Sequence, residues 1–218
     1  MSQIKTRIKI CGLTREADVD AAVAAGADAI GFVFYPRSPR YVSPARAAQL
    51  VARIPAFVTV VALFVNASAE EIDPVLDAVP VNLLQFHGDE TEAACRRWRI
   101  PYVKAARVRA GMDLLQYAAG FGSARALLLD AFVEGFGGGG KTFDWSLVPP
   151  DLPLPVILSG GLDAANVGEA IRRLAPSAVD VSSGVEAGSG EMKGIKDAAK
   201  IAAFVAAVRA ADQQAEDA

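Results

Sequence analysis

The feature that most constrains the fold is a short apolar run, a turn and a helix-forming segment, which follow one another eight times along the 218 residues. The repeat is roughly 25 to 30 residues long, which is typical of strand–helix units. The runs are continuously apolar, as expected of parallel strands buried on both faces. The expected strands are Ile4–Cys11, Ala29–Phe34, Phe57–Val65, Val81–Phe86, Tyr102–Ala106, Arg125–Asp130, Val156–Leu158 and Ala178–Val181.

Eight such units predict a single (β/α)8 barrel over residues 1–218, with a frayed polar tail from about residue 211. The hydrophobic content of 52% is sufficient for a core of that size. The alternative, an open doubly wound sheet, would need fewer strands or an additional domain. The fifth strand is the weakest prediction because Lys104 lies within it.

Capping residues mark where the expected helices begin. Thr14 is expected to cap the first helix, and Ser68 with Glu71 forms a capping box for the third. Asp163 is expected to cap the helix that follows the seventh strand. The fourth helix is expected to continue through Trp98.

Charge and cysteine content exclude several classes of protein. The net charge is −3 and no cluster of Lys and Arg occurs, which argues against nucleic-acid binding. The longest apolar run is far too short to span a bilayer, and the N-terminus lacks an apolar signal core. Two distant cysteines and one histidine fit neither a disulfide framework nor a zinc site. We therefore expect a cytoplasmic protein without metal, membrane or nucleic-acid partner, and the oligomeric state stays open.

Three reactive side chains follow expected strands, at the end of a barrel where active sites lie. Cys11 ends the first strand close to a helix start, where the pKa of a thiol can be lowered. Asp130 ends the sixth strand, and Arg40 lies in the second loop. A thiol and a carboxyl group on opposite sides of the barrel suit a base and an acid. The alternatives are a buried apolar Cys11, a loop-anchoring Asp130 and a solvated Arg40.

Small residues follow the seventh and eighth strands, the two positions where barrels commonly bind phosphate. Backbone N–H groups in such loops can approach an anion closely. The alternative is that these glycines only form tight turns. The candidate phosphate-binding residues are Gly160, Gly161, Ser182, Ser183 and Gly184.

Seven motifs in order give the chain a specific resemblance. They are KICGLT at 9–14, SPR at 38–40, QFHG at 85–88, LD at 129–130, GKTFDW at 140–145, LSGGL at 158–162 and DVSSGVE at 180–186. In this order they resemble the phosphoribosylanthranilate isomerases, barrel enzymes of tryptophan biosynthesis.

The resemblance implies an Amadori rearrangement of N-(5-phosphoribosyl)anthranilate to an open-chain 1-deoxyribulose phosphate, with no metal or organic cofactor. It implies that Asp130 protonates the ribose ring oxygen and that Cys11, as a thiolate, removes the C2′ proton. Arg40 would pair with the anthranilate carboxylate. The loops after the last two strands would hold the phosphate. Further residues that would shape the pocket are Gln85, His87 and Asp180.

One loop departs from the family pattern, and two other functions compete with this one. Gly138–Lys141 lacks the threonine expected before the lysine, and we predict that Phe136–Lys141 forms a lid over the substrate. The histidine-pathway isomerase is similar in fold, but it has a carboxylate where this chain has Cys11. A barrel that only binds phosphate is the other alternative, although it would have no reason to carry the acid and the thiol.

Overall fold

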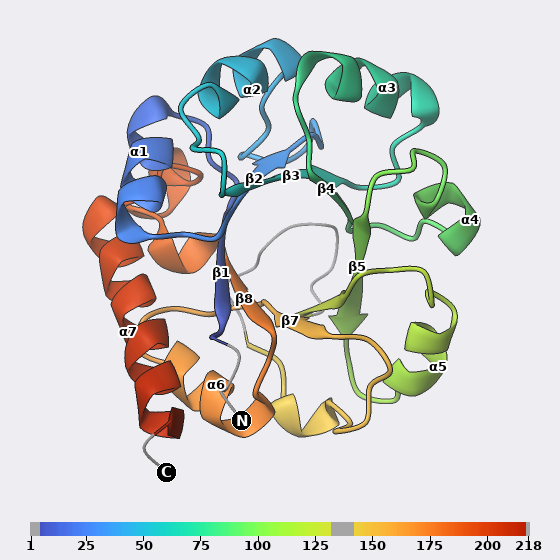
Figure 1. The fold of residues 1–218 in the computed structure, drawn as a ribbon, viewed down its shortest axis with the longest axis vertical. Coiled ribbons are helices and arrows are strands. Elements are labelled where there is room, and N and C mark those ends of the chain that lie inside the picture. Colours follow the sequence, from blue (N-terminus) through green and yellow to red (C-terminus); the bar gives the residue numbers. More distant parts are fainter. Residues whose placement is uncertain (1–4, 132–141, 217–218) are drawn as a thin grey trace.

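Eight parallel strands form a closed barrel in the computed structural model, which describes residues 5–131 and 142–216 (Figure 1). Each strand pairs with the next along the chain, and β8 closes the barrel against β1. The predicted (β/α)8 fold is confirmed. The strands are β1 (Arg7–Cys11), β2 (Ala29–Val33), β3 (Thr59–Phe64), β4 (Leu83–Phe86), β5 (Tyr102–Val108), β6 (Leu127–Ala131), β7 (Val156–Leu158) and β8 (Ala178–Val181).

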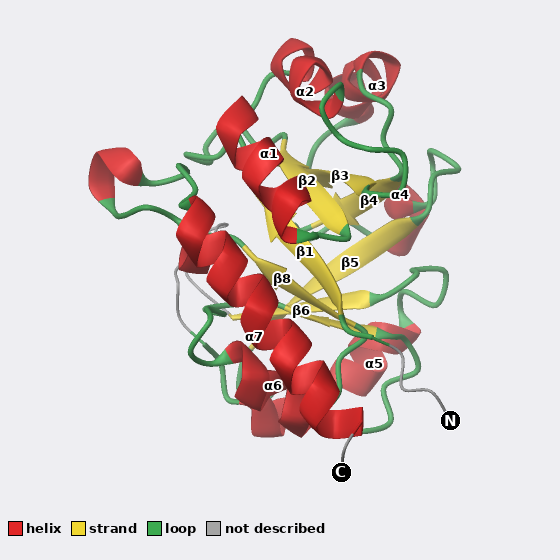
Figure 2. Ribbon diagram, turned by 60° about the vertical axis from the view of Figure 1, so that its left-hand side comes forward, coloured by secondary structure: helices red, strands yellow, loops and turns green. Residues whose placement is uncertain are grey.

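Helices surround the barrel, and the longest, α7, runs beside α1 and α6 (Figures 1 and 2). The α-helices are α1 (Glu16–Ala25), α2 (Pro44–Val51), α3 (Ala69–Ala78), α4 (Glu92–Cys95), α5 (Leu114–Ala119), α6 (Val167–Leu174) and α7 (Ala198–Glu216). Short 3-10 helices are η1 (Trp145–Leu147), η2 (Ser183–Val185) and η3 (Gly190–Met192). No described helix has the length and apolar character needed to cross a membrane.

Successive side chains of a strand point alternately toward the surrounding helices and toward the interior of the barrel. On β1, Ile8 and Ile10 are fully buried in the apolar layer between strands and helices. Lys9 and Cys11 alternate with them and face the interior of the barrel, where Lys9 pairs with Asp180 of β8. The carboxyl end of each strand therefore carries its last inward side chain to one end of the barrel.

Two predicted helix starts are wrong, because each helix begins later in the chain than the predicted cap implies. Arg15, not Thr14, precedes α1, and the Thr14 carbonyl accepts hydrogen bonds from Arg46. Asn166, not Asp163, precedes α6; the Asp163 carboxylate instead accepts from two backbone N–H groups of the preceding turn. The Glu71 carboxylate of the predicted capping box does accept from the Ser68 N–H group, at 2.8 Å.

Two predicted helix ends are also wrong. Helix α4 ends at Cys95 rather than Trp98, and Arg99 follows with a positive φ of 54°. The expected frayed tail is helical to Glu216, because Asp212 accepts hydrogen bonds from the Thr6 N–H and hydroxyl groups. These bonds fix the C-terminal helix to the start of β1.

Candidate active site

A cavity opens at the carboxyl ends of the strands. It brings together most of the predicted site residues; Gly184 does not line it. Its walls also include an apolar patch that sequence reasoning missed, formed beside Cys11 by Val33, Tyr35, Leu63 and Val65. The spacing of Leu63 and Val65, two residues apart at the end of a strand, was the available signal. The predicted residues in the wall are Cys11, Arg40, Gln85, His87, Asp130, Gly160, Gly161, Asp180, Ser182 and Ser183.

Two hydrogen bonds connect the end of β4 to Asp130 near the end of β6. They run from Gln85 to His87 and from His87 to Asp130. The Gln85 side-chain amide donates to His87 Nδ1 at 3.0 Å, which leaves the proton of the neutral imidazole on Nε2. His87 Nε2 then donates to Asp130 Oδ2 at 3.1 Å. The other oxygen, Oδ1, accepts from the Ala131 N–H group at 2.8 Å. His87 is thus held between Gln85 and Asp130, and its ring lies against the Asp130 carboxyl group.

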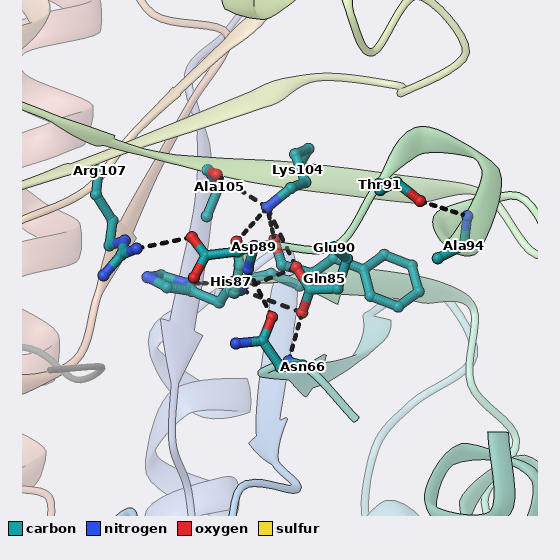
Figure 3. A network of polar contacts seen from close by, with 12 residues as sticks. Asn66, Gln85, His87, Asp89, Glu90, Thr91, Ala94, Lys104, Ala105 and Arg107 are labelled. Atoms are coloured by element: carbon teal, nitrogen blue, oxygen red, sulfur yellow. Dashed lines mark hydrogen bonds and ion pairs between the residues drawn. The ribbon is translucent and has the colours of Figure 1, made fainter. Parts of the chain in front are cut away.

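A polar network behind His87 fixes the loop that follows β4 (Figure 3). The Lys104 ammonium donates to the Gly88 carbonyl at 2.6 Å and to Glu90 Oε2 at 3.2 Å. Glu90 in turn accepts from the N–H groups of Gly88 and Asn66. This network explains why a lysine is buried within β5: its ammonium satisfies carbonyls at the end of β4. A Cβ at Gly88 would lie 2.7 Å from the Asn66 backbone nitrogen, so only glycine fits there.

Cys11 is almost fully buried at the end of β1, facing the cavity. Burial raises the pKa of its thiol, and the nearby Lys9 ammonium opposes this only in part. The expected lowering of the pKa by a helix N-terminus is therefore wrong. The physical reason is that α1 begins only at Glu16, while the thiol lies in the barrel interior.

Arg40 is buried at the rim of the cavity and is not the solvated cation of the alternative interpretation. Its stem passes over Gly12, where a Cβ would lie 2.6 Å from Arg40 Cδ. Nε donates to Glu186 Oε1 at 2.6 Å, whereas Nη2 has no hydrogen-bond partner among the described residues. Such an unpartnered guanidinium nitrogen at a cavity wall suits an anionic ligand.

Glu186 and Lys196 are functional candidates that sequence reasoning missed. Lys196 Nζ donates to Glu186 Oε1 at 3.2 Å and to the Ser182 carbonyl at 2.9 Å. Burial alone would raise the pKa of Glu186, but the hydrogen bond from Arg40 and the charge of Lys196 hold it below its usual range. A carboxylate thus fixes Arg40, and a cation lies behind the loop that follows β8.

The loops after β7 and β8 form a small concave surface. Gly160 and Gly161 have positive φ angles of 82° and 63°, and their N–H groups donate to no other group in the described part of the chain. The Ser182 hydroxyl donates to the Cys11 carbonyl at 3.0 Å. Gly184 lies behind this surface, where a Cβ would be 1.9 Å from the Leu162 carbonyl oxygen. Free N–H groups and a neighbouring cation suit a phosphate.

The predicted lid, Phe136–Lys141, lies outside the described residues. Over residues 5–131 and 142–216, no group of three or more His, Cys, Asp or Glu side chains is arranged to hold a metal ion.

Comparison with known proteins points to one family. Residues 8–207 match the family model for N-(5'-phosphoribosyl)anthranilate isomerase. An N-(5'-phosphoribosyl)anthranilate isomerase of Dechloromonas aromatica is 67% identical over 96% of this chain and 99% of its own length. The crystal structure of the phosphoribosyl anthranilate isomerase of Thermotoga maritima is 42% identical, with a TM-score of 0.84 over 94% of this chain and 99% of that one.

A further solved isomerase is in complex with reduced 1-(o-carboxyphenylamino)-1-deoxyribulose 5-phosphate. It is 40% identical, with a TM-score of 0.81 over 94% of this chain and 99% of that one. The family model covers most of the chain, and the relative from Dechloromonas aromatica matches nearly all of it. The chain therefore belongs to the N-(5'-phosphoribosyl)anthranilate isomerase family of tryptophan biosynthesis.

Proposed function

We propose that Cys11 is the general base and Asp130 the general acid in the isomerisation of N-(5'-phosphoribosyl)anthranilate. One observation carries this assignment: the two groups line the same cavity from β1 and β6, which are far apart around the barrel. A ligand that fills the cavity would contact both. One reaction can then use a proton donor on one side and a proton acceptor on the other.

The walls of the cavity suit three groups of this substrate, namely its aromatic ring, the carboxylate on that ring and the phosphate. The compound bound to the solved family member carries a benzoate ring and a sugar phosphate. In this chain the apolar patch of Val33, Leu63 and Val65 would contact the ring, and Arg40 Nη2 would bind its carboxylate. The N–H groups of the Gly160 loop would bind the phosphate, with Ser182, Ser183 and Gly184 shaping the other side.

Ring opening is the first proposed step. Asp130 gives its proton to the ribose ring oxygen as the bond from that oxygen to C1′ breaks, and the nitrogen lone pair forms the C1′=N bond. The carboxylate left behind keeps the N–H groups of His87 and Ala131 as donors. These two hydrogen bonds keep the Asp130 side chain in the same position through the step.

Proton removal from C2′ is the second step. The Cys11 thiolate takes this proton, the C–H electron pair forms the C1′=C2′ bond, and the iminium pair returns to nitrogen. The resulting enolamine tautomerises to the ketone when the Cys11 thiol gives its proton to C1′ and the Asp130 carboxylate takes the proton of the C2′ hydroxyl, which returns both groups to their starting states. Atoms and electrons balance without an external oxidant, so the residues of the cavity suffice for the chemistry.

The remaining assignments concern the cellular compartment, the role of Asp180 and the choice of substrate. We infer a cytoplasmic enzyme, because both cysteines are free thiols and the substrate is a small phosphorylated metabolite. Asp180, which lines the cavity beside Ser159, would face the sugar. The histidine-pathway alternative is not favoured, because Cys11 occupies the position of its carboxylate base.

Substituting Arg40 tests the substrate orientation. We expect Arg40→Met to raise KM for N-(5'-phosphoribosyl)anthranilate by about 10- to 100-fold, because a charge-assisted hydrogen bond to the carboxylate is lost. Glu186 keeps Lys196 as its partner, so the fold should be retained. The assay is the decay of anthranilate fluorescence during turnover, with Arg37→Met, an exposed residue of the same loop, as the matched control. An unchanged KM in Arg40→Met would exclude this carboxylate site.

A further inference from the structure

We propose that Lys9 is a positioning residue for Cys11, whose thiolate form it stabilises from inside the barrel, and that Asp180 holds Lys9 there. The inference rests on the proposed function, in which Cys11 is the base. Lys9 itself does not line the cavity, whereas Cys11 and Asp180 do. Lys9 would therefore act through Cys11 and not by contact with the substrate.

The thiol and the ammonium share a space that a glycine leaves open. Gly31 on β2 is the register partner of Cys11 on β1. The point that a Cβ of Gly31 would occupy lies 2.9 Å from Cys11 Sγ and 3.1 Å from Lys9 Nζ. Any larger residue at this position would displace one or both groups. The absence of a side chain on Gly31 thus lets the ammonium and the sulfur lie close together.

Asp180 fixes the ammonium in this position. It is the register partner of Lys9 across the β1–β8 seam, and the Lys9 Nζ to Asp180 Oδ1 distance is 2.8 Å. The Ser159 hydroxyl, at 3.4 Å, donates to the other carboxylate oxygen. Within the described residues, Lys9 donates to no oxygen other than that of Asp180. An ammonium has three N–H groups, so a donor is left for the sulfur.

The charges around Cys11 explain why the Lys9 ammonium matters for the thiolate. Three charged groups act on the buried thiol: Lys9 on the same strand, Asp180 on β8 and Lys196 beyond β8. Lys9 and Lys196 favour the thiolate, and Asp180 opposes it. Lys196 already donates to Glu186 and to the Ser182 carbonyl and hydroxyl, which leaves Lys9 as the cation with a donor for the sulfur. A buried thiolate without a counter-ion would be too costly to serve as a base.

The test measures alkylation of Cys11 by iodoacetamide as a function of pH, with the Cys11 peptide identified by mass spectrometry. Only the thiolate reacts, so the midpoint of the rate profile reports the protonation of Cys11. In Lys9→Met we expect the midpoint to rise by about 1 to 3 pH units. We expect kcat at pH 7 to fall by at least about tenfold with little change in KM, and part of this loss to be recovered as the pH rises. Asp180→Asn should move the midpoint in the opposite direction.

Several results would overturn the inference. A midpoint in Lys9→Met equal to that of the wild type would show that Lys9 only supports the fold. If Lys9→Met does not fold because Asp180 loses its partner, Lys9→Met/Asp180→Asn removes both charges. The proposal then requires that the double variant have a higher midpoint than Asp180→Asn. Alkylation needs no substrate, so it separates this inference from the proposed function, which fails instead if Cys11→Ala retains turnover.

Discussion

Asp130→Asn is expected to lower kcat for N-(5'-phosphoribosyl)anthranilate by about 10²- to 10⁴-fold, the range that a positioned general acid contributes. An amide has nearly the shape of the carboxyl group but cannot give a proton to the ribose oxygen. The affinity for reduced 1-(o-carboxyphenylamino)-1-deoxyribulose 5-phosphate, the reduced product analogue, should change little. The measurement is steady-state turnover by fluorescence, with the analogue affinity determined on the same preparation.

The surroundings of Asp130 explain why this variant should fold. The amide nitrogen can face His87 if the imidazole takes the opposite tautomer, and Gln85 can turn its amide so that Oε1 accepts from Nδ1. Gln85 Oε1 has no hydrogen-bond partner within the described part of the chain, so nothing there opposes that change. Asp113→Asn, at the exposed cap of α5, is the matched control and should keep full activity. A loss of less than tenfold in Asp130→Asn would assign the acid role to another group.

Lys104→Met is expected to lower the free energy of unfolding by about 3 to 5 kcal/mol, as removal of one partner from a buried ion pair does. The change would leave Glu90 buried without its cation and would remove the donor to the Gly88 carbonyl. The measurement is urea denaturation, with the slope against urea checked for an unchanged unfolded state.

Two further variants make the stability result specific. Lys104→Met/Glu90→Gln removes both charges and should recover part of the loss, because no buried charge is then unpaired. Arg53→Met breaks an exposed ion pair between the turn after α2 and Asp20 of α1, and it should leave stability close to that of the wild type. Equal losses in Lys104→Met and Arg53→Met would contradict the role given to the buried network.

The strands could be predicted from the sequence because burial on both faces makes each run continuously apolar. The errors in the strand prediction concern a strand boundary and a buried charged residue. Phe57 was expected in the third strand, yet it is fully exposed in the loop before β3, which begins at Thr59. Lys104 made the fifth strand appear weak, because a sequence does not show that its ammonium reaches the carbonyls of Phe86, at the end of β4, and of Gly88 in the loop that follows.

The site was predictable where chemistry lies at a strand end and not where it depends on distant contacts. The barrel brings the carboxyl ends of all strands together, so Cys11 and Asp130 could be placed in one cavity from sequence position alone. Glu186 is separated from Arg40 by 146 residues, and only the closure of β8 on β1 makes them partners. The raised pKa of Cys11 likewise follows from burial, which no local motif reveals.

The most direct test of the acid–base assignment is the turnover of freshly prepared N-(5'-phosphoribosyl)anthranilate by the wild type and by Cys11→Ala, followed as the decay of anthranilate fluorescence. The assignment predicts rapid turnover by the wild type and a loss of at least about 100-fold in Cys11→Ala, with binding of the reduced product analogue preserved. Turnover by Cys11→Ala within tenfold of the wild type would contradict it, since the C2′ proton would then leave without the thiol.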